Sequence, residues 1–124
     1  LIKSPSVYPY WYEEWDEQMV EYAKQNDISY INFLEVADEI GIDYEKDTFD
    51  AGLHLNLSGA EKFTRYFGKI LAEDFGLENR KDELELASVW NEKLDFYNWM
   101  KQDQLSELAK YGKLISYGAP AQAQ

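Results

Sequence analysis

The order of hydrophobic segments in the first 34 residues limits the possible folds more than any other feature of the sequence. Leu1–Lys3 resembles the end of a β-strand, 11–25 has aromatic residues at near-helical spacing, and 28–34 is a short run of β-branched and aromatic residues. A strand, a helix and a strand in this order form a unit with two parallel strands and a right-handed crossover. The sequence therefore predicts an α/β fold.

Local signals place the first helix at Trp11–Gln25, with Asn26-Asp27 as its end. A second helix is predicted to start at Ser58, because Ser58 and Glu61 have the spacing of a capping box. Gly76 is predicted to end this second helix. Its inner face is expected to consist of Ala60, Phe63, Phe67, Ile70 and Leu71.

A long helical period runs from Leu84 to about Tyr111, with an expected break near Gln102-Asp103 and an end at Gly112. The chain is thus predicted to consist of the C-terminal part of a domain over 1–77, a helical extension over 78–117 and a disordered tail over 118–124.

Composition excludes several classes of function. The chain has 124 residues with a formal net charge of −12, and nucleic acid is not an expected partner because phosphate binding requires clustered Lys and Arg. The absence of cysteine excludes disulfides, thiolate metal sites and a cysteine nucleophile. No stretch approaches the ~18 apolar residues of a membrane span. The start at Leu1 rather than Met indicates a fragment.

His54 is the only histidine, so any mechanism that needs an imidazole must use it. It precedes the second helix on a loop expected to leave a strand end, where open α/β sheets bind ligands. Asp50 lies four residues upstream, and its carboxylate can accept the imidazole Nδ1 proton. Gly52 would let the backbone turn, and Asn56 would brace the loop through hydrogen bonds to the backbone. On spacing alone, a structural or simply exposed histidine is the commoner explanation.

The run Asp50-Ala-Gly-Leu-His54-Leu-Asn56-Leu-Ser-Gly-Ala-Glu-Lys resembles the last conserved block of the SGNH/GDSL hydrolases. Leu1–Pro5 and Ile28–Glu35 resemble the segment upstream of this block in a bacterial subgroup, and the sequence around Trp90 and Tyr97 resembles its C-terminal extension. The resemblance implies the C-terminal portion of a flavodoxin-like three-layer α/β/α domain, followed by a long helical extension.

The same resemblance implies a serine esterase or acyltransferase that acts on acyl esters of cell-envelope carbohydrate. His54 would be the general base and Asp50 its partner, with Gly52 and Asn56 as loop support. The family's nucleophilic serine and oxyanion-hole Gly and Asn belong to N-terminal blocks that are not in this sequence. We therefore expect an active intact protein, extracytoplasmic or membrane-anchored, and an inactive fragment. No metal ion or organic cofactor is expected.

The expected partners are an acyl-ester substrate, the missing N-terminal half of the domain and, through self-association or a domain swap, a second copy of the chain. One departure from the family pattern concerns the acid. The family spacing is Asp-x-x-His, whereas here it is Asp-x-x-x-His, with Ala51 at the family's acid position. We favour Asp50 over Asp47 as the acid, because Gly52 can absorb one extra residue.

Three other interpretations stay open at this stage. An aromatic platform could bind carbohydrate in a non-catalytic module. The helix from Leu84 could cover a flank of the sheet or a neighbouring subunit through Trp90, Tyr97 and Trp99. An acidic run could bind a hard cation, although its spacing lacks the Gly and terminal Glu of a Ca²⁺ loop, which favours a solvated loop. The platform is Tyr8, Tyr10, Trp11, Tyr12 and Trp15, and the acidic run is Asp43, Glu45, Asp47 and Asp50.

Overall fold

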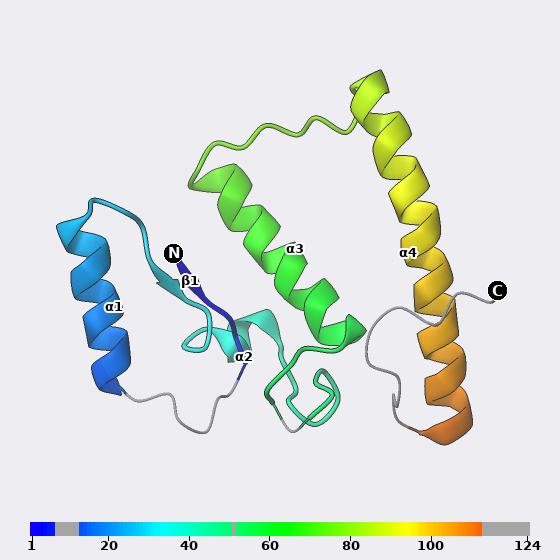
Figure 1. Ribbon diagram of the computed structural model, residues 1–124, viewed down its shortest axis with the longest axis horizontal. Coiled ribbons are helices and arrows are strands. Elements are labelled where there is room, and N and C mark those ends of the chain that lie inside the picture. Colours follow the sequence, from blue (N-terminus) through cyan, green and yellow to red (C-terminus); the bar gives the residue numbers. More distant parts are fainter. Residues whose placement is uncertain (7–12, 51, 113–124) are drawn as a thin grey trace. The chain divides into compact units, whose positions relative to one another are not determined.

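The computed structural model describes residues 1–6, 13–50 and 52–112 (Figure 1). This part of the chain is mostly helical with one small parallel sheet, so its class is mixed α/β. It divides into two compact units, Leu1–Ile70 and Leu71–Gln124. The elements in chain order are β1 (Ile2–Lys3), α1 (Glu13–Gln25), β2 (Ile31–Asn32), α2 (Ala37–Ile40), α3 (Leu57–Glu73) and α4 (Leu84–Tyr111).

The predicted strand–helix–strand unit is confirmed. β1 and β2 pair in parallel, with Ile2 opposite Ile31 and Lys3 opposite Asn32, and α1 connects them. The paired region is shorter than the run 28–34 suggested. The last bond of the ladder runs from the Phe33 amide to the Lys3 carbonyl. Pro5, two residues after Lys3, has no amide hydrogen with which to extend the ladder.

α1 ends where the sequence predicted, at Asn26-Asp27. Asp27 has a φ of 51°, the Ile28 amide donates to the Ala23 carbonyl at 3.0 Å, and the Asp27 amide donates to the Lys24 carbonyl at 3.4 Å. These bonds form a Schellman motif with Asp27 in the position that usually holds glycine. The predicted beginning of this helix at Trp11 lies outside the described residues.

A polar contact fastens α1 to β2. The Asp16 carboxylate on α1 accepts hydrogen bonds from the Tyr30 hydroxyl at 2.6 Å and from the Asn32 amide group at 3.0 Å. Burial, together with the bond to Asp16, raises the pKa of Tyr30. Ala23 is the one buried residue of α1, whereas Trp15 and Tyr22 are exposed. The hydrogen bonds to Asp16 therefore help to fix the position of α1.

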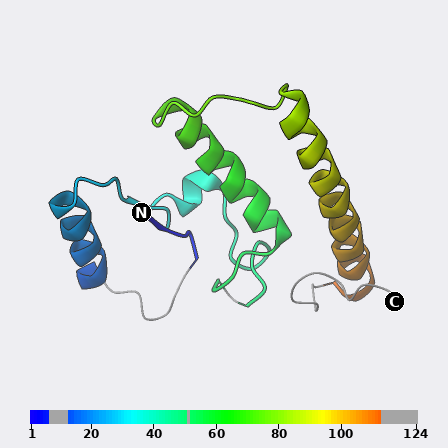
Figure 2. The ribbon, with the colours of Figure 1, turned by 45° about the horizontal axis from the view of Figure 1, so that its top comes forward.

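The core of the first unit surrounds the fully buried ring of Phe33. The rings of Phe63 and Phe67 on α3 meet it edge-on, with centroids at 4.9 and 5.4 Å. Figure 2 shows α2 beside α3, and α2 adds buried Ala37 and Ile40 to the same cluster. The predicted inner-face positions Phe63, Phe67 and Ile70 are confirmed as core contacts, and Tyr66 joins them without having been predicted.

α4 is continuous from Leu84 to Tyr111, so the predicted long helix is confirmed and the predicted break near Gln102-Asp103 is wrong. Glutamine and aspartate cost a helix interior less than glycine or proline, so these two residues do not stop it. The helix ends at Gly112, which has a φ of 68° and donates its amide to the Leu108 carbonyl at 2.8 Å. The predicted tail over 118–124 lies outside the described residues.

Gly76, which was predicted to end the second helix, has a φ of 65° and follows the end of α3 at Glu73. The next amide, that of Leu77, donates to the Leu71 carbonyl at 3.0 Å. Among the helices of the described residues, none combines the length and the apolar character needed to cross a membrane.

The left-handed conformation of Asp27 predicts a stabilising substitution. Asp27→Gly should raise the free energy of unfolding by up to about 1 kcal/mol, because glycine has no Cβ to strain this backbone. Asn26→Gly is the matched control: Asn26 lacks a positive φ and its side chain bonds to the Tyr22 carbonyl, so this change should not stabilise. Urea titrations of both variants measure the effect. Equal stability of Asp27→Gly and the wild type would contradict the strain assigned to Asp27.

Candidate functional site

Residues 47–50 and 52–56, here called the dyad loop, pair with each other before α3. The Asn56 amide donates to the Asp47 carbonyl at 2.9 Å, Thr48 and Leu55 form an isolated antiparallel bridge, and the Phe49 amide donates to the His54 carbonyl at 2.9 Å. Within the described residues the loop follows α2, not a strand as the sequence analysis expected. The chain leaves α2 through Gly41, whose φ of 78° turns it toward the loop.

The loop brings the two predicted site residues into contact. Asp50 Oδ2 lies 2.6 Å from His54 Nδ1, and Asp50 Oδ1 accepts the His54 backbone amide at 2.7 Å. The hydrogen bond from His54 holds the pKa of Asp50 below its usual range. The His54 side chain is 63% exposed and that of Asp50 is 33% exposed. With Nδ1 held by Asp50, Nε2 is the imidazole atom that can act as a base.

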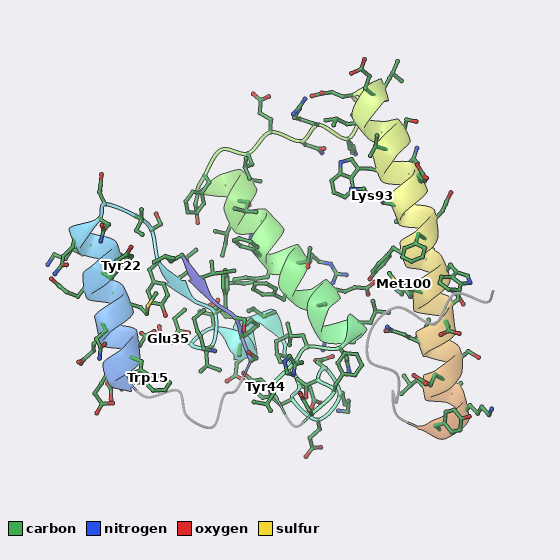
Figure 3. All side chains as sticks on the ribbon, in the orientation of Figure 1. Trp15, Tyr22, Glu35, Tyr44, Lys93 and Met100 are labelled. Atoms are coloured by element: carbon green, nitrogen blue, oxygen red, sulfur yellow. The ribbon has the colours of Figure 1, made fainter. Side chains whose placement is uncertain are left out.

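Gly52 has the role that the sequence suggested for the backbone. Its φ of 108° lies in a region that side chains with a Cβ rarely adopt. Its amide donates to the Thr48 hydroxyl oxygen at 2.9 Å, and that hydroxyl in turn donates to the Tyr44 carbonyl. Tyr44, labelled in Figure 3, packs against the Phe33 cluster. The turn of the dyad loop is thereby connected to the core. Ala51 lies outside the described residues.

Asn56 braces the loop and also caps α3. Its side-chain amide group donates to the Lys46 carbonyl at 2.6 Å, and its Oδ1 accepts the Gly59 amide at 3.2 Å. The Ala60 amide makes the first helical bond to the Asn56 carbonyl at 2.8 Å. The capping box predicted at Ser58 is therefore wrong, because α3 begins at Leu57 and Asn56 supplies the cap.

Asp47, the alternative acid, has a different environment from Asp50. Its side chain is only 1% exposed, and its Oδ2 accepts the Asp43 amide at 2.8 Å and the Lys62 ammonium at 2.5 Å. Burial alone would raise the pKa of Asp47, but the hydrogen bonds from Lys62, the Asp43 backbone and Ser58 hold it below its usual range. The contact with His54 belongs to Asp50.

The other interpretations gain little from the geometry. Asp43 forms an ion pair with Lys46, which neutralises part of the negative charge of the acidic run. In the part of the chain that the structure describes, no three acidic or histidine side chains converge as a metal site would require. Of the aromatic platform only Trp15 is described, and it is exposed on α1. On α4, Trp90 and Trp99 are exposed.

Two features of the site were missed from the sequence. Lys62 is fifteen positions from Asp47, and no local pattern marks such a pair. Gly59 was noted only as part of the motif, yet a Cβ at this position would lie 2.3 Å from the Asp47 carbonyl oxygen. The first turn of α3 can approach Asp47 this closely only with glycine at 59.

Comparisons of the chain with family models, with curated proteins and with solved structures gave no match. The resemblance to SGNH/GDSL hydrolases therefore stays a prediction, which rests mainly on the residues of the dyad loop and the first turn of α3.

The Asp47–Lys62 pair gives stability a pH dependence of defined sign. Since folding lowers the pKa of Asp47, the pair contributes fully above the ordinary carboxyl pKa of about 4 and loses its contribution as the pH falls through the lowered value. Lys62→Met should cost about 2–3 kcal/mol at neutral pH, because Lys62 is 35% exposed and the pair is only partly buried.

Urea titrations of Lys62→Met and the wild type at several pH values measure this cost. The difference should narrow as the pH falls below the ordinary carboxyl range and through the lowered pKa of Asp47, because protonation removes the charge that Lys62 pairs with. Lys69→Met, at an exposed position on the same helix, is the control and should change stability little. A difference between Lys62→Met and wild type that is the same at all pH values would contradict an ionic role for Lys62.

Proposed function

We propose that this chain carries the Asp/His end of an SGNH-type serine esterase or acyltransferase that acts on acyl esters of cell-envelope carbohydrate. The observation that carries the proposal is the 2.6 Å contact between Asp50 Oδ2 and His54 Nδ1, in which the His54 side chain is largely exposed. A carboxylate bonded to Nδ1 fixes the tautomer in which Nε2 is the basic nitrogen. The only histidine of the chain thus has the orientation that a general base requires.

In the proposed reaction, His54 Nε2 removes the proton of a serine hydroxyl supplied from outside these 124 residues. The serine oxygen forms a bond to the acyl carbon, and the resulting oxyanion is held by donors that also come from outside the chain. His54 then returns the proton to the leaving alcohol as its bond to the acyl carbon breaks. Asp50 stabilises the imidazolium between these two transfers. Water or a second alcohol completes the cycle, which gives hydrolysis or acyl transfer.

The proposal includes the wider fold. The parallel β1–α1–β2 unit and the helix that follows the dyad loop agree with the C-terminal portion of a flavodoxin-like three-layer α/β/α domain. β1 and β2 would then be two strands of a larger sheet, with further strands from the N-terminal half of the domain or from a second copy of the chain. Exposed Leu1 and Ile2 at β1 are apolar residues that such strands would cover. An extracytoplasmic or membrane-anchored location of the intact protein belongs to the same proposal.

A non-catalytic module that binds carbohydrate or a partner protein is the second candidate. It is favoured by the tryptophans of α4, since Trp90 and Trp99 are exposed and large aromatic side chains often form contact surfaces. The dyad has no role in this alternative, so loss of His54 would leave binding unchanged.

Fluorophosphonate labelling of a longer protein that contains this chain tests the proposal. The intact protein should react, the 124-residue chain alone should not, and His54→Ala should slow labelling by at least about a hundredfold because the general base is lost. Asp50→Asn should also slow it, since the neutral amide does not stabilise the imidazolium and its NH2 group can hold His54 in the wrong tautomer. Asp43→Asn is the control, because Asp43 bonds to Lys46 and not to His54.

Labelling of the intact protein at an unchanged rate in His54→Ala would exclude His54 as the base. Absence of labelling in every sample would favour the non-catalytic module.

A further inference from the structure

Lys62 joins three segments of the first unit that are distant in sequence. From α3, its ammonium donates to Asp47 Oδ2 at 2.5 Å and to the Gly41 carbonyl at 2.8 Å. Gly41 is the C-cap of α2, and Asp47 is the first residue of the dyad loop. The Asp47 carboxylate also accepts the Asp43 amide, so the segment between α2 and the loop is held at both ends. One side chain of α3 thus fixes where the dyad loop begins.

The main chain at Asp47 lies close against the first turn of α3. Its carbonyl oxygen accepts the Asn56 amide. A Cβ at position 59 would lie 2.3 Å from the same oxygen, so no side chain larger than that of Gly59 fits there. Asn56 in turn caps α3 through its bond to the Gly59 amide. The first and last residues of the dyad loop are therefore both set by the Asp47–α3 contact, because Asp47 opens the loop and Asn56 closes it.

The dyad lies at the far end of this arrangement. From the base of the loop toward its turn, the Asp47–Asn56 bond is followed by the Thr48–Leu55 bridge and the Phe49–His54 bond. The contact between Asp50 and His54 comes last. An exposed charged contact has little energy of its own with which to hold a geometry. The hydrogen bonds at the base of the loop, next to the nearly fully buried Asp47 carboxylate, stabilise the loop geometry more strongly.

We propose that Lys62 and Asp47 are positioning residues for the Asp50–His54 dyad, which they hold through the base of the dyad loop. The inference rests on the proposed function, in which this dyad is catalytic, but it concerns the geometry of His54 and can be tested without turnover. A merely structural role for Lys62 would change stability while the folded protein kept His54 as it is.

The test is the tautomer of His54, read from the ¹⁵N shifts of its two ring nitrogens. Because the chain has one histidine, these signals need no assignment between residues. The 124-residue chain is studied at about pH 8.5, where an ordinary imidazole is neutral. The wild type should carry its proton on Nδ1, bonded to Asp50. Lys62→Met should lose this preference, so that the proton moves largely to Nε2 and the two shifts approach those of an imidazole without a partner.

Two variants provide the controls. Lys62→Arg keeps the cation and should restore the wild-type signals, and Lys69→Met removes an exposed lysine of the same helix and should leave them unchanged. The methyl signals of Ile40 and Ile42, which pack in the Phe33 cluster, report whether each variant is folded. If Lys62→Met does not fold, the double variant Asp47→Asn/Lys62→Met avoids an uncompensated buried charge and is read in the same way.

A folded variant without Lys62 that keeps the wild-type His54 shifts would overturn the inference. The proposed function fails separately. Tautomer loss in Lys62→Met, together with fluorophosphonate labelling that does not depend on His54, would support the positioning role and exclude the catalytic one. Labelling that depends on His54, with unchanged His54 shifts in Lys62→Met, would support the catalytic role of His54 and exclude the positioning role of Lys62. A wild type with no proton on Nδ1 would overturn both.

Discussion

The buried carboxylate of Asp47 is the constraint on which the rest of the first unit depends. An ionised group that is 1% exposed costs several kcal/mol unless it is paired and hydrogen-bonded. Three partners from two segments meet that requirement: Lys62 and Ser58 from α3, and the Asp43 amide from the chain after α2. Each partner can bond to Asp47 only if its segment is in place. The burial of one charge thereby links α2, the dyad loop and α3 into one arrangement.

The two carboxylates of the dyad loop illustrate how environment separates roles. Asp47 is buried, bonded to a lysine and placed against the first turn of α3, which suits an anchor. Asp50 is partly exposed and bonded to the imidazole of a largely exposed histidine, which suits a group that must meet a substrate. A reactive pair must be accessible and must also keep its geometry. In this loop buried Asp47 fixes the geometry, while Asp50 and His54 stay accessible.

Sequence patterns predicted the features that depend on local order. The parallel strand–helix–strand unit, the long α4 and the end of α1 at Asp27 all follow from hydrophobic period and turn residues. The contact of Asp50 with His54 could also be predicted, because the two residues are four positions apart and Gly52 between them lets the backbone turn. The cap was misplaced from Asn56 to Ser58, since both residue types cap helices and the choice depends on the contact of Ser58 with Asp47. The Asp47–Lys62 pair and the approach of Gly59 to Asp47 are tertiary contacts, which leave no periodic signal.

Amide hydrogen exchange tests most directly whether the dyad loop and α3 form one cooperative body. The amides of Asn56 and Gly59 bond to the Asp47 carbonyl and to the Asn56 side chain, at positions where the end of a helix would ordinarily fray. The account predicts that both exchange as slowly as the amide of Phe67 in the middle of α3, and that all three respond equally to denaturant. Fast exchange of Asn56 and Gly59 while Phe67 stays protected would show that the loop opens by itself, and would contradict the account.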